Sequence, residues 1–150
     1  MKPGENNLIP FNRPPLHKID VANKPIFIFE PSDENTDAST VASFGEEWLK
    51  FNGFDKKELE LISNEYFDLC TQKVLPENAL VLDLGCGSGR WSACLANRVA
   101  QIEAVDPSKA IFAAAQVTRH YHNIRLSQCS VSCLDRKSTR LNSSHIPLSR

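Results

Sequence analysis

The sequence predicts an α/β fold: a parallel sheet, incomplete at about three strands, preceded by a helical leader. The first observation is the stretch Val81-Leu82-Asp83-Leu84-Gly85-Cys86-Gly87-Ser88-Gly89, where an apolar run ends in an acid and three alternate glycines. The second is Ile102-Glu103-Ala104-Val105-Asp106, another short apolar run that ends in an acid. Two such runs with a helical stretch between them are typical of a βαβ unit.

The first part of the chain divides into two predicted segments. Residues 1–38 contain six of the nine prolines, all before residue 32, and are expected to be extended, with residues 26–29 as a short strand or a strip that packs on the body. Residues 39–75 are expected to form a helical cap of two helices. The first is capped by Ser39 or Thr40 and ends near Gly53, and the second begins at Asp55 and continues through Lys73. The cap is either a lid over a ligand or plain core packing, and the aromatic stripe favours packing.

The remaining elements follow the two motifs. A helix is expected over 90–98, with Trp91, Cys94 and Leu95 facing the sheet, and another over 110–118. Pro107 after Asp106 fits the first turn of that second helix, with Asp106 as its capping acid. A third strand is expected at 124–128.

The residue types of the two motifs point to nucleotide binding. Glycines at positions 85, 87 and 89 let the chain take positive φ and bring bare backbone against a ligand. Backbone N–H groups at the start of the next helix attract a carboxylate or a phosphate. Asp106 lies 21 residues after Gly85, close to the spacing at which a βαβ unit presents a carboxylate to ribose hydroxyls.

The glycine spacing discriminates between ligands. The dinucleotide fingerprint requires a sixth-position glycine, which is Arg90 here, so binding of NAD or FAD is disfavoured. The pattern Asp83-x-Gly85-x-Gly87-x-Gly89 instead resembles the class I S-adenosylmethionine (SAM) dependent methyltransferases, over about residues 79–134. The resemblance implies a Rossmann-like sheet, SAM as the cofactor, and residues 76–134 as the N-terminal part of the SAM-binding domain.

The resemblance also implies a set of cofactor-binding residues. Asp83 would orient the glycine loop or the amino group of the cofactor, and Asp106 would accept the ribose hydroxyls. The loop over 129–131 would reach the adenine, although this chain has Ser130 where many members carry an acid. The full set is Asp83, Gly85, Cys86, Gly87, Ser88, Gly89, Asp106, Pro107, Ser130 and Val131.

The resemblance predicts methyl transfer to an acceptor that the residues leave open. A small molecule is preferred because residues 44–48 look like the leader of some small-molecule methyltransferases and the net charge of −1 indicates no basic surface for nucleic acid. No catalytic base can be assigned. The alternatives are an NAD-linked oxidoreductase and a non-catalytic nucleotide-binding module.

The last sixteen residues change the expectation for the whole chain. Residues 135–145 read Asp-Arg-Lys-Ser-Thr-Arg-Leu-Asn-Ser-Ser-His, which is one reading frame of a common sequencing-adapter DNA. We therefore expect residues 135–150 to be a non-native tail and the native sequence to be cut short near Leu134, before the acceptor site. The chain as given is then expected to be an inactive fragment.

Cysteine and histidine patterns predict neither a disulfide scaffold nor a metal site. The five cysteines are odd in number and contain no Cys-x-x-Cys pair, and His120-x-His122 is typical of a solvated turn. No apolar run is long enough to span a bilayer, and the N-terminus has no apolar signal-peptide core. The predicted location is the cytoplasm, with no membrane partner.

Overall fold

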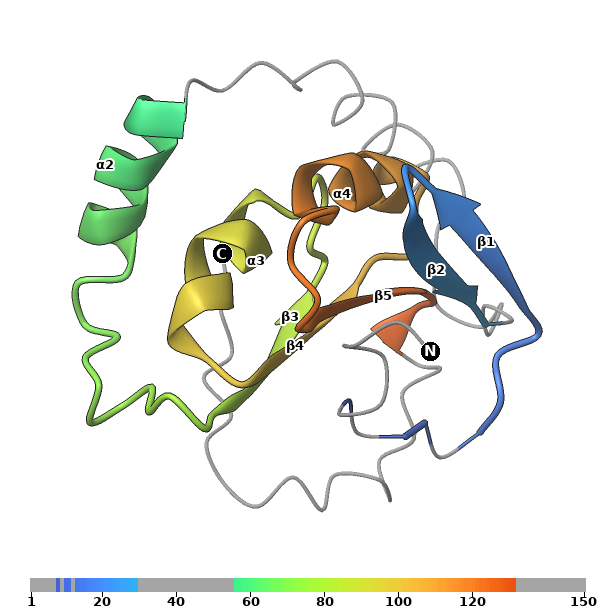
Figure 1. Cartoon of the computed structure of the whole chain (residues 1–150), viewed down its shortest axis with the longest axis horizontal. Coiled ribbons are helices and arrows are strands. Elements are labelled where there is room, and N and C mark those ends of the chain that lie inside the picture. Colours follow the sequence, from blue (N-terminus) through green and yellow to red (C-terminus); the bar gives the residue numbers. More distant parts are fainter. Residues whose placement is uncertain (1–7, 9, 12, 30–55, 132–150) are drawn as a thin grey trace.

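The computed structural model describes residues 8, 10–11, 13–29 and 56–131. These residues form a five-stranded sheet in the order β1-β2-β5-β4-β3, with helices beside it (Figure 1). The elements are β1 (His17–Val21), β2 (Lys24–Ile28), α2 (Lys56–Tyr66), β3 (Leu80–Leu84), α3 (Arg90–Leu95), the 3-10 turn η2 (Ala96–Arg98), β4 (Gln101–Val105), α4 (Ala110–Thr118) and β5 (Ile124–Gln128). None of the helices described is long and apolar enough to cross a membrane.

The parallel part of the sheet is the one that the sequence predicts. β3 pairs with β4 from Leu80 opposite Gln101 to Leu84 opposite Val105, and β4 pairs with β5 in the same direction. The third strand has the predicted bounds, and the second begins and ends one residue earlier than expected. The α/β class and the mostly parallel, Rossmann-like sheet are therefore confirmed.

A β-hairpin that the sequence did not predict extends this sheet. β1 and β2 are antiparallel, and β2 continues the sheet in parallel beside β5, with Ile26 opposite Leu126. The hairpin turn consists of Ala22 and Asn23, whose φ angles are 52° and 63°. Such two-residue turns usually contain glycine, so Ala22-Asn23 is only a weak turn signal. Residues 26–29 pack on the body as expected, but as part of a five-stranded sheet rather than beside a three-stranded one.

The main core lies between one face of the sheet and the helices. Figure 1 shows α3 and α4 on the same side of the sheet, because two successive crossovers in one direction place both helices on one face. The largest fully buried aliphatic side chains of this core come from four elements and are Ile26, Ile102, Ile111, Ile124 and Leu126. Each contributes about 1.5 to 3 kcal/mol to folding by leaving water.

Helix α2 is shorter than the sequence predicted. It ends at Tyr66, not near Lys73, and Leu69 is 80% exposed instead of buried. The chain turns there because Phe67 and Leu75 both enter the main core, which a straight helix through Lys73 would prevent. The periodic pattern of apolar residues continued past the point where tertiary packing ends the helix.

Aromatic packing joins α2 to α3. The Tyr66 ring stacks on Trp91 with a centroid distance of 4.6 Å, and Phe67 meets the edge of Trp91 at 5.7 Å. These contacts support the packing interpretation of this part of the cap. The predicted first helix, residues 39–53, and the leader-like residues 44–48 lie outside the described residues.

The predicted helix over 90–98 is present in two parts. α3 ends at Leu95, and η2 continues it as a 3-10 turn to Arg98. Leu95 is buried in the main core, and Trp91 and Cys94 pack against that core, as expected. Because α3 begins directly after Gly89, the packing of α3 on the core determines where the glycine loop ends.

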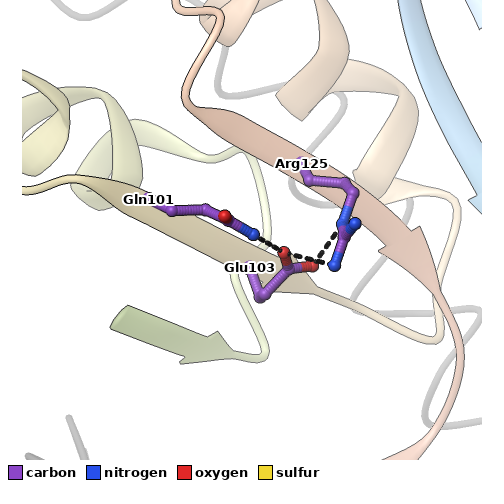
Figure 2. Close-up of polar contacts among 3 residues, drawn as sticks. All are labelled: Gln101, Glu103 and Arg125. Atoms are coloured by element: carbon purple, nitrogen blue, oxygen red, sulfur yellow. Dashed lines mark hydrogen bonds and ion pairs between the residues drawn. The ribbon is translucent and has the colours of Figure 1, made fainter. Parts of the chain in front are cut away.

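The other face of the sheet carries a polar cluster, Gln101, Glu103 and Arg125. Glu103 and Arg125 are register partners on β4 and β5, and the guanidinium binds both carboxylate oxygens, at 2.7 and 2.9 Å. Figure 2 shows the Gln101 amide directed at the same carboxylate, to which it donates a hydrogen bond. Burial raises the pKa of Glu103, and the bonds from Arg125 and Gln101 oppose that rise.

Candidate cofactor site

The glycine loop between β3 and α3 has the backbone conformation that its sequence predicts. Gly85, Gly87 and Gly89 have φ angles of 73°, 54° and 73°. A Cβ on Gly85 would meet no heavy atom within 4 Å, so the loop faces open space there. A Cβ on Gly89 would lie 2.9 Å from Cβ of Ala114. The first glycine thus leaves room for a ligand, whereas the last allows α3 and α4 to approach.

Backbone hydrogen bonds attach the loop to the end of β4. The N–H groups of Gly85 and Cys86 both donate to the carbonyl oxygen of Val105, at 2.8 and 3.1 Å. The N–H of Gly89 donates to the Cys86 carbonyl at 2.9 Å, which closes the turn before α3. These bonds of the loop are made by main chain to main chain and do not depend on the side chains of the loop.

Asp83, the acid of the first motif, is buried below this loop. Its Oδ2 accepts a hydrogen bond of 2.6 Å from the hydroxyl of Ser92 on α3, and Ser92 is itself fully buried. Sequence reasoning missed Ser92. The available signal was its position: Ser92 is a polar residue three positions before Leu95, on the buried face of the same short helix.

Asp106, the acid after β4, connects the two predicted motifs. Its Oδ2 accepts the N–H of Gly87 at 2.9 Å. Its Oδ1 accepts both the N–H of Ser108, at 2.8 Å, and the Ser108 hydroxyl, at 2.6 Å. The structure therefore brings together the glycine loop and the acid that the sequence paired by spacing.

The cap of α4 differs from the prediction. The helix begins at Ala110, so Pro107 precedes it instead of lying in its first turn. The Ser108 hydroxyl oxygen, not Asp106, accepts the N–H of Ala110, at 3.1 Å. Asp106 instead bonds the chain two residues ahead, as Asp commonly does in turns. A serine two residues before an alanine-rich helix was the signal for this cap.

Gln128 at the end of β5 holds the same turn from the other side. Its side-chain amide donates to the carbonyl oxygens of Pro107 and Ser108, at 3.3 and 3.4 Å. This contact joins the turn after β4 to the segment after β5. Nothing in the sequence pattern distinguished Gln128 from any other polar residue that ends a strand.

The predicted adenine loop follows β5 at the same edge of the sheet. Cys129 is buried against Phe29 and Val105, Ser130 is buried, and Val131 is 63% exposed. Since β3, β4 and β5 are parallel, the glycine loop, Asp106 and this segment all leave the carboxyl edge of the sheet, where ligands bind in open α/β folds.

Cys86 is a packing residue of the glycine loop. Burial raises the pKa of its thiol well above the ordinary value, and the negative charges of Asp83 and Asp106 raise it further. The thiol therefore stays protonated and is a poor nucleophile. Within the described ranges, no three His, Cys, Asp or Glu residues are grouped so that they could hold a metal ion.

The residues at this edge fit an adenosyl cofactor. The open space at Gly85 admits a ligand against the main chain, and Asp106 is a buried carboxylate with acceptor capacity at the end of β4. Three parallel strands followed by a glycine turn, an acid and a third loop define a Rossmann-like domain.

Residues 81–145 match the family model described as "Methyltransferase domain". Together with this fold and this glycine spacing, the match supports a class I SAM-dependent methyltransferase, a family whose members generally use SAM. No match was found among curated proteins. The likeness to this family rests on the glycine loop, the strands around it and the matched segment, and the roles of single residues stay predictions.

Proposed function

We propose that the chain is the cofactor-binding half of a SAM-dependent methyltransferase that acts on a small-molecule acceptor. The observation that carries this proposal is the 2.9 Å hydrogen bond from Gly87 to Asp106, because it unites the glycine loop and the acid in one site. When bound, SAM supplies an electrophilic methyl group on a sulfonium. Aligning two bound reactants lowers the activation barrier by about 7 to 11 kcal/mol. A site that binds and orients SAM and the acceptor therefore supplies much of the rate enhancement.

Each predicted residue has a defined task in this proposal. Gly85 admits the cofactor against bare backbone, and Asp83, oriented by Ser92, faces the loop from below. Asp106 accepts ribose hydroxyls, and the segment containing Ser130 and Val131 borders the adenine. The preference for a small-molecule acceptor is supported by the leader-like residues 44–48 and the net charge of −1.

The acceptor half of the protein is proposed to be encoded beyond Leu134. The support is the identity of residues 135–145 to one frame of a sequencing adapter. The family match extends through the same segment to residue 145 and does not add to this support. Sequencing the locus across the Leu134 codon tests the proposal. Native codons that continue as Asp135-Arg136-Lys137 in independent reads would contradict it.

Calorimetry on the full gene product tests the function. SAM and S-adenosylhomocysteine are expected to bind, and NAD is not. Binding of NAD alone would favour an oxidoreductase, and binding of SAM without methyl transfer to any of a panel of small-molecule acceptors would favour a non-catalytic module. Either result would contradict the proposed activity.

A further inference from the structure

The Asp106 carboxylate is already occupied by three donors from the protein. A carboxylate has about four lone-pair positions, two on each oxygen. Oδ1 holds two donors, the N–H and the hydroxyl of Ser108, and Oδ2 holds one, the N–H of Gly87. One position therefore remains on Oδ2, whereas a ribose offers two hydroxyl groups.

Two of the three donors are fixed by the fold. The N–H of Gly87 belongs to a loop that is bonded through its main chain to Val105. The N–H of Ser108 belongs to a turn whose carbonyl oxygens are bound by Gln128. Neither N–H can leave Asp106 unless a buried turn moves, which would leave a backbone donor without a partner.

The Ser108 hydroxyl is the donor that can be released. It turns about its own C–O bond without any movement of the backbone. Its oxygen keeps the hydrogen bond from the N–H of Ala110 during that rotation, so the cap of α4 is retained. The released proton can then be donated to the ribose oxygen that takes its place.

We propose that Ser108 is a specificity-determining residue that makes the two ribose hydroxyls of the cofactor unequal. One hydroxyl takes the open position on Oδ2 at no loss of an existing bond. The other gains its place on Oδ1 only by displacing the Ser108 hydroxyl, so its net contribution is small. This inference rests on the proposed function, in which Asp106 binds the ribose.

The test compares three ligands on the full gene product by calorimetry: S-adenosylhomocysteine and its 2′-deoxy and 3′-deoxy forms. In the wild type, loss of one hydroxyl should weaken binding about tenfold or more, as expected for a hydrogen bond to a charged group, and loss of the other less than about threefold. In Ser108→Ala, which frees the second position on Oδ1, both losses should weaken binding about tenfold or more.

Ser108→Thr is the matched control, because it retains both the hydroxyl donor and the cap acceptor. It should keep the unequal pattern of the wild type, and thermal unfolding of both variants reports the integrity of α4. Equal losses in the wild type, or an unequal pattern that persists in a folded Ser108→Ala, would overturn the inference while leaving the proposed function intact. A full gene product that binds none of the three ligands would overturn both.

Discussion

Gly87 donates its backbone N–H to Oδ2 of Asp106 at 2.9 Å, so the glycine loop after β3 and the acid after β4 are bonded to each other directly. Nineteen residues separate the two in sequence, and β3 and β4 lie side by side. The site at the carboxyl edge of the sheet is therefore preformed around a fixed carboxylate, which limits what the ligand has to reorganise on binding.

Asp106→Ala should weaken SAM binding at least about tenfold, because the bond from one ribose hydroxyl to the open position of this charged acceptor contributes about 1.5 to 3 kcal/mol. The substitution also removes the acceptor for Gly87 and Ser108. Asp106→Asn keeps the shape of the side chain and loses its charge, so its affinity for SAM should lie between those of the wild type and Asp106→Ala. Calorimetry with SAM measures both variants. An affinity in Asp106→Ala equal to the wild type would remove this residue from the site.

The two outer glycines of the loop should respond differently to alanine. Gly89→Ala combines a positive φ with a Cβ 2.9 Å from Ala114, and should lower the free energy of unfolding by about 2 to 5 kcal/mol. Gly85→Ala has only the positive φ, and should cost about 1 to 2 kcal/mol. Its Cβ enters the open space, so the larger effect should be on cofactor affinity.

Urea unfolding and calorimetry separate the two effects. Ala114→Gly relieves the overlap at residue 89 and should recover part of the stability lost in Gly89→Ala, although glycine in a helix costs about 1 kcal/mol. It should recover nothing in Gly85→Ala. Additive losses in the Gly89→Ala, Ala114→Gly double variant would show that the close approach does not limit this position.

Arg125→Met should destabilise the fold by about 3 kcal/mol at neutral pH, because it leaves the Glu103 carboxylate buried without its cation. The variant raises the pKa of Glu103 further above the value of the unfolded chain. The folded state then binds the proton more tightly, so the defect should be small near pH 4.5 and should grow as the pH rises.

Urea unfolding at several pH values measures this defect. Replacing both partners with methionine should cost less than Arg125→Met alone, because no unpaired charge is then buried. A defect that is the same at pH 4.5 and pH 8 would assign the loss to the contact between Arg125 and the Phe11 ring instead, where the guanidinium carbon lies 3.7 Å from the ring centroid.

Lys24 should make the protein more stable as the pH rises above 8. Burial lowers its pKa from 10.5 to about 8 in the folded state, where its amine donates to the Tyr121 carbonyl. Below pH 8 both states hold the proton and burial of the charge is unfavourable. Between about 8 and 10.5 the unfolded chain binds more protons, so folding becomes more favourable with rising pH.

Lys24→Met should remove that rise. The difference in unfolding free energy between wild type and variant is followed by urea unfolding from pH 7 to pH 10. The two curves should converge or cross as the wild type gains stability. Curves that stay parallel would show that the amine is solvated in the folded state.

Local chemistry explains which parts of this fold could be predicted. The glycine loop, Asp106 and β5 depend on residues close in sequence, such as an apolar run that meets glycines. The β1-β2 hairpin could not be predicted because its turn uses Ala22 and Asn23 without a glycine. The end of α2 depends on where Phe67 and Leu75 enter the core, which is a property of the assembled molecule.

The candidate site shows the same difference between features set by neighbouring residues and features set by the tertiary fold. Positive φ at the three glycines follows from residue type, and the structure confirms it. Ser92, Ser108 and Gln128 bind partners through the tertiary fold, and serine and glutamine are too common for their presence alone to indicate a role. The signal that was available, a serine two residues before α4, indicated a helix cap and not a bond to Asp106.

The pairing of β2 with β5 also sets the order of events during synthesis. About a hundred residues separate Ile26 from its partner Leu126. At about 5 to 20 residues per second, the ribosome leaves β2 without its parallel neighbour for roughly 5 to 20 seconds. During this interval the emerging hairpin leaves Ile26 and Phe27 uncovered, so it offers apolar side chains that a chaperone can bind.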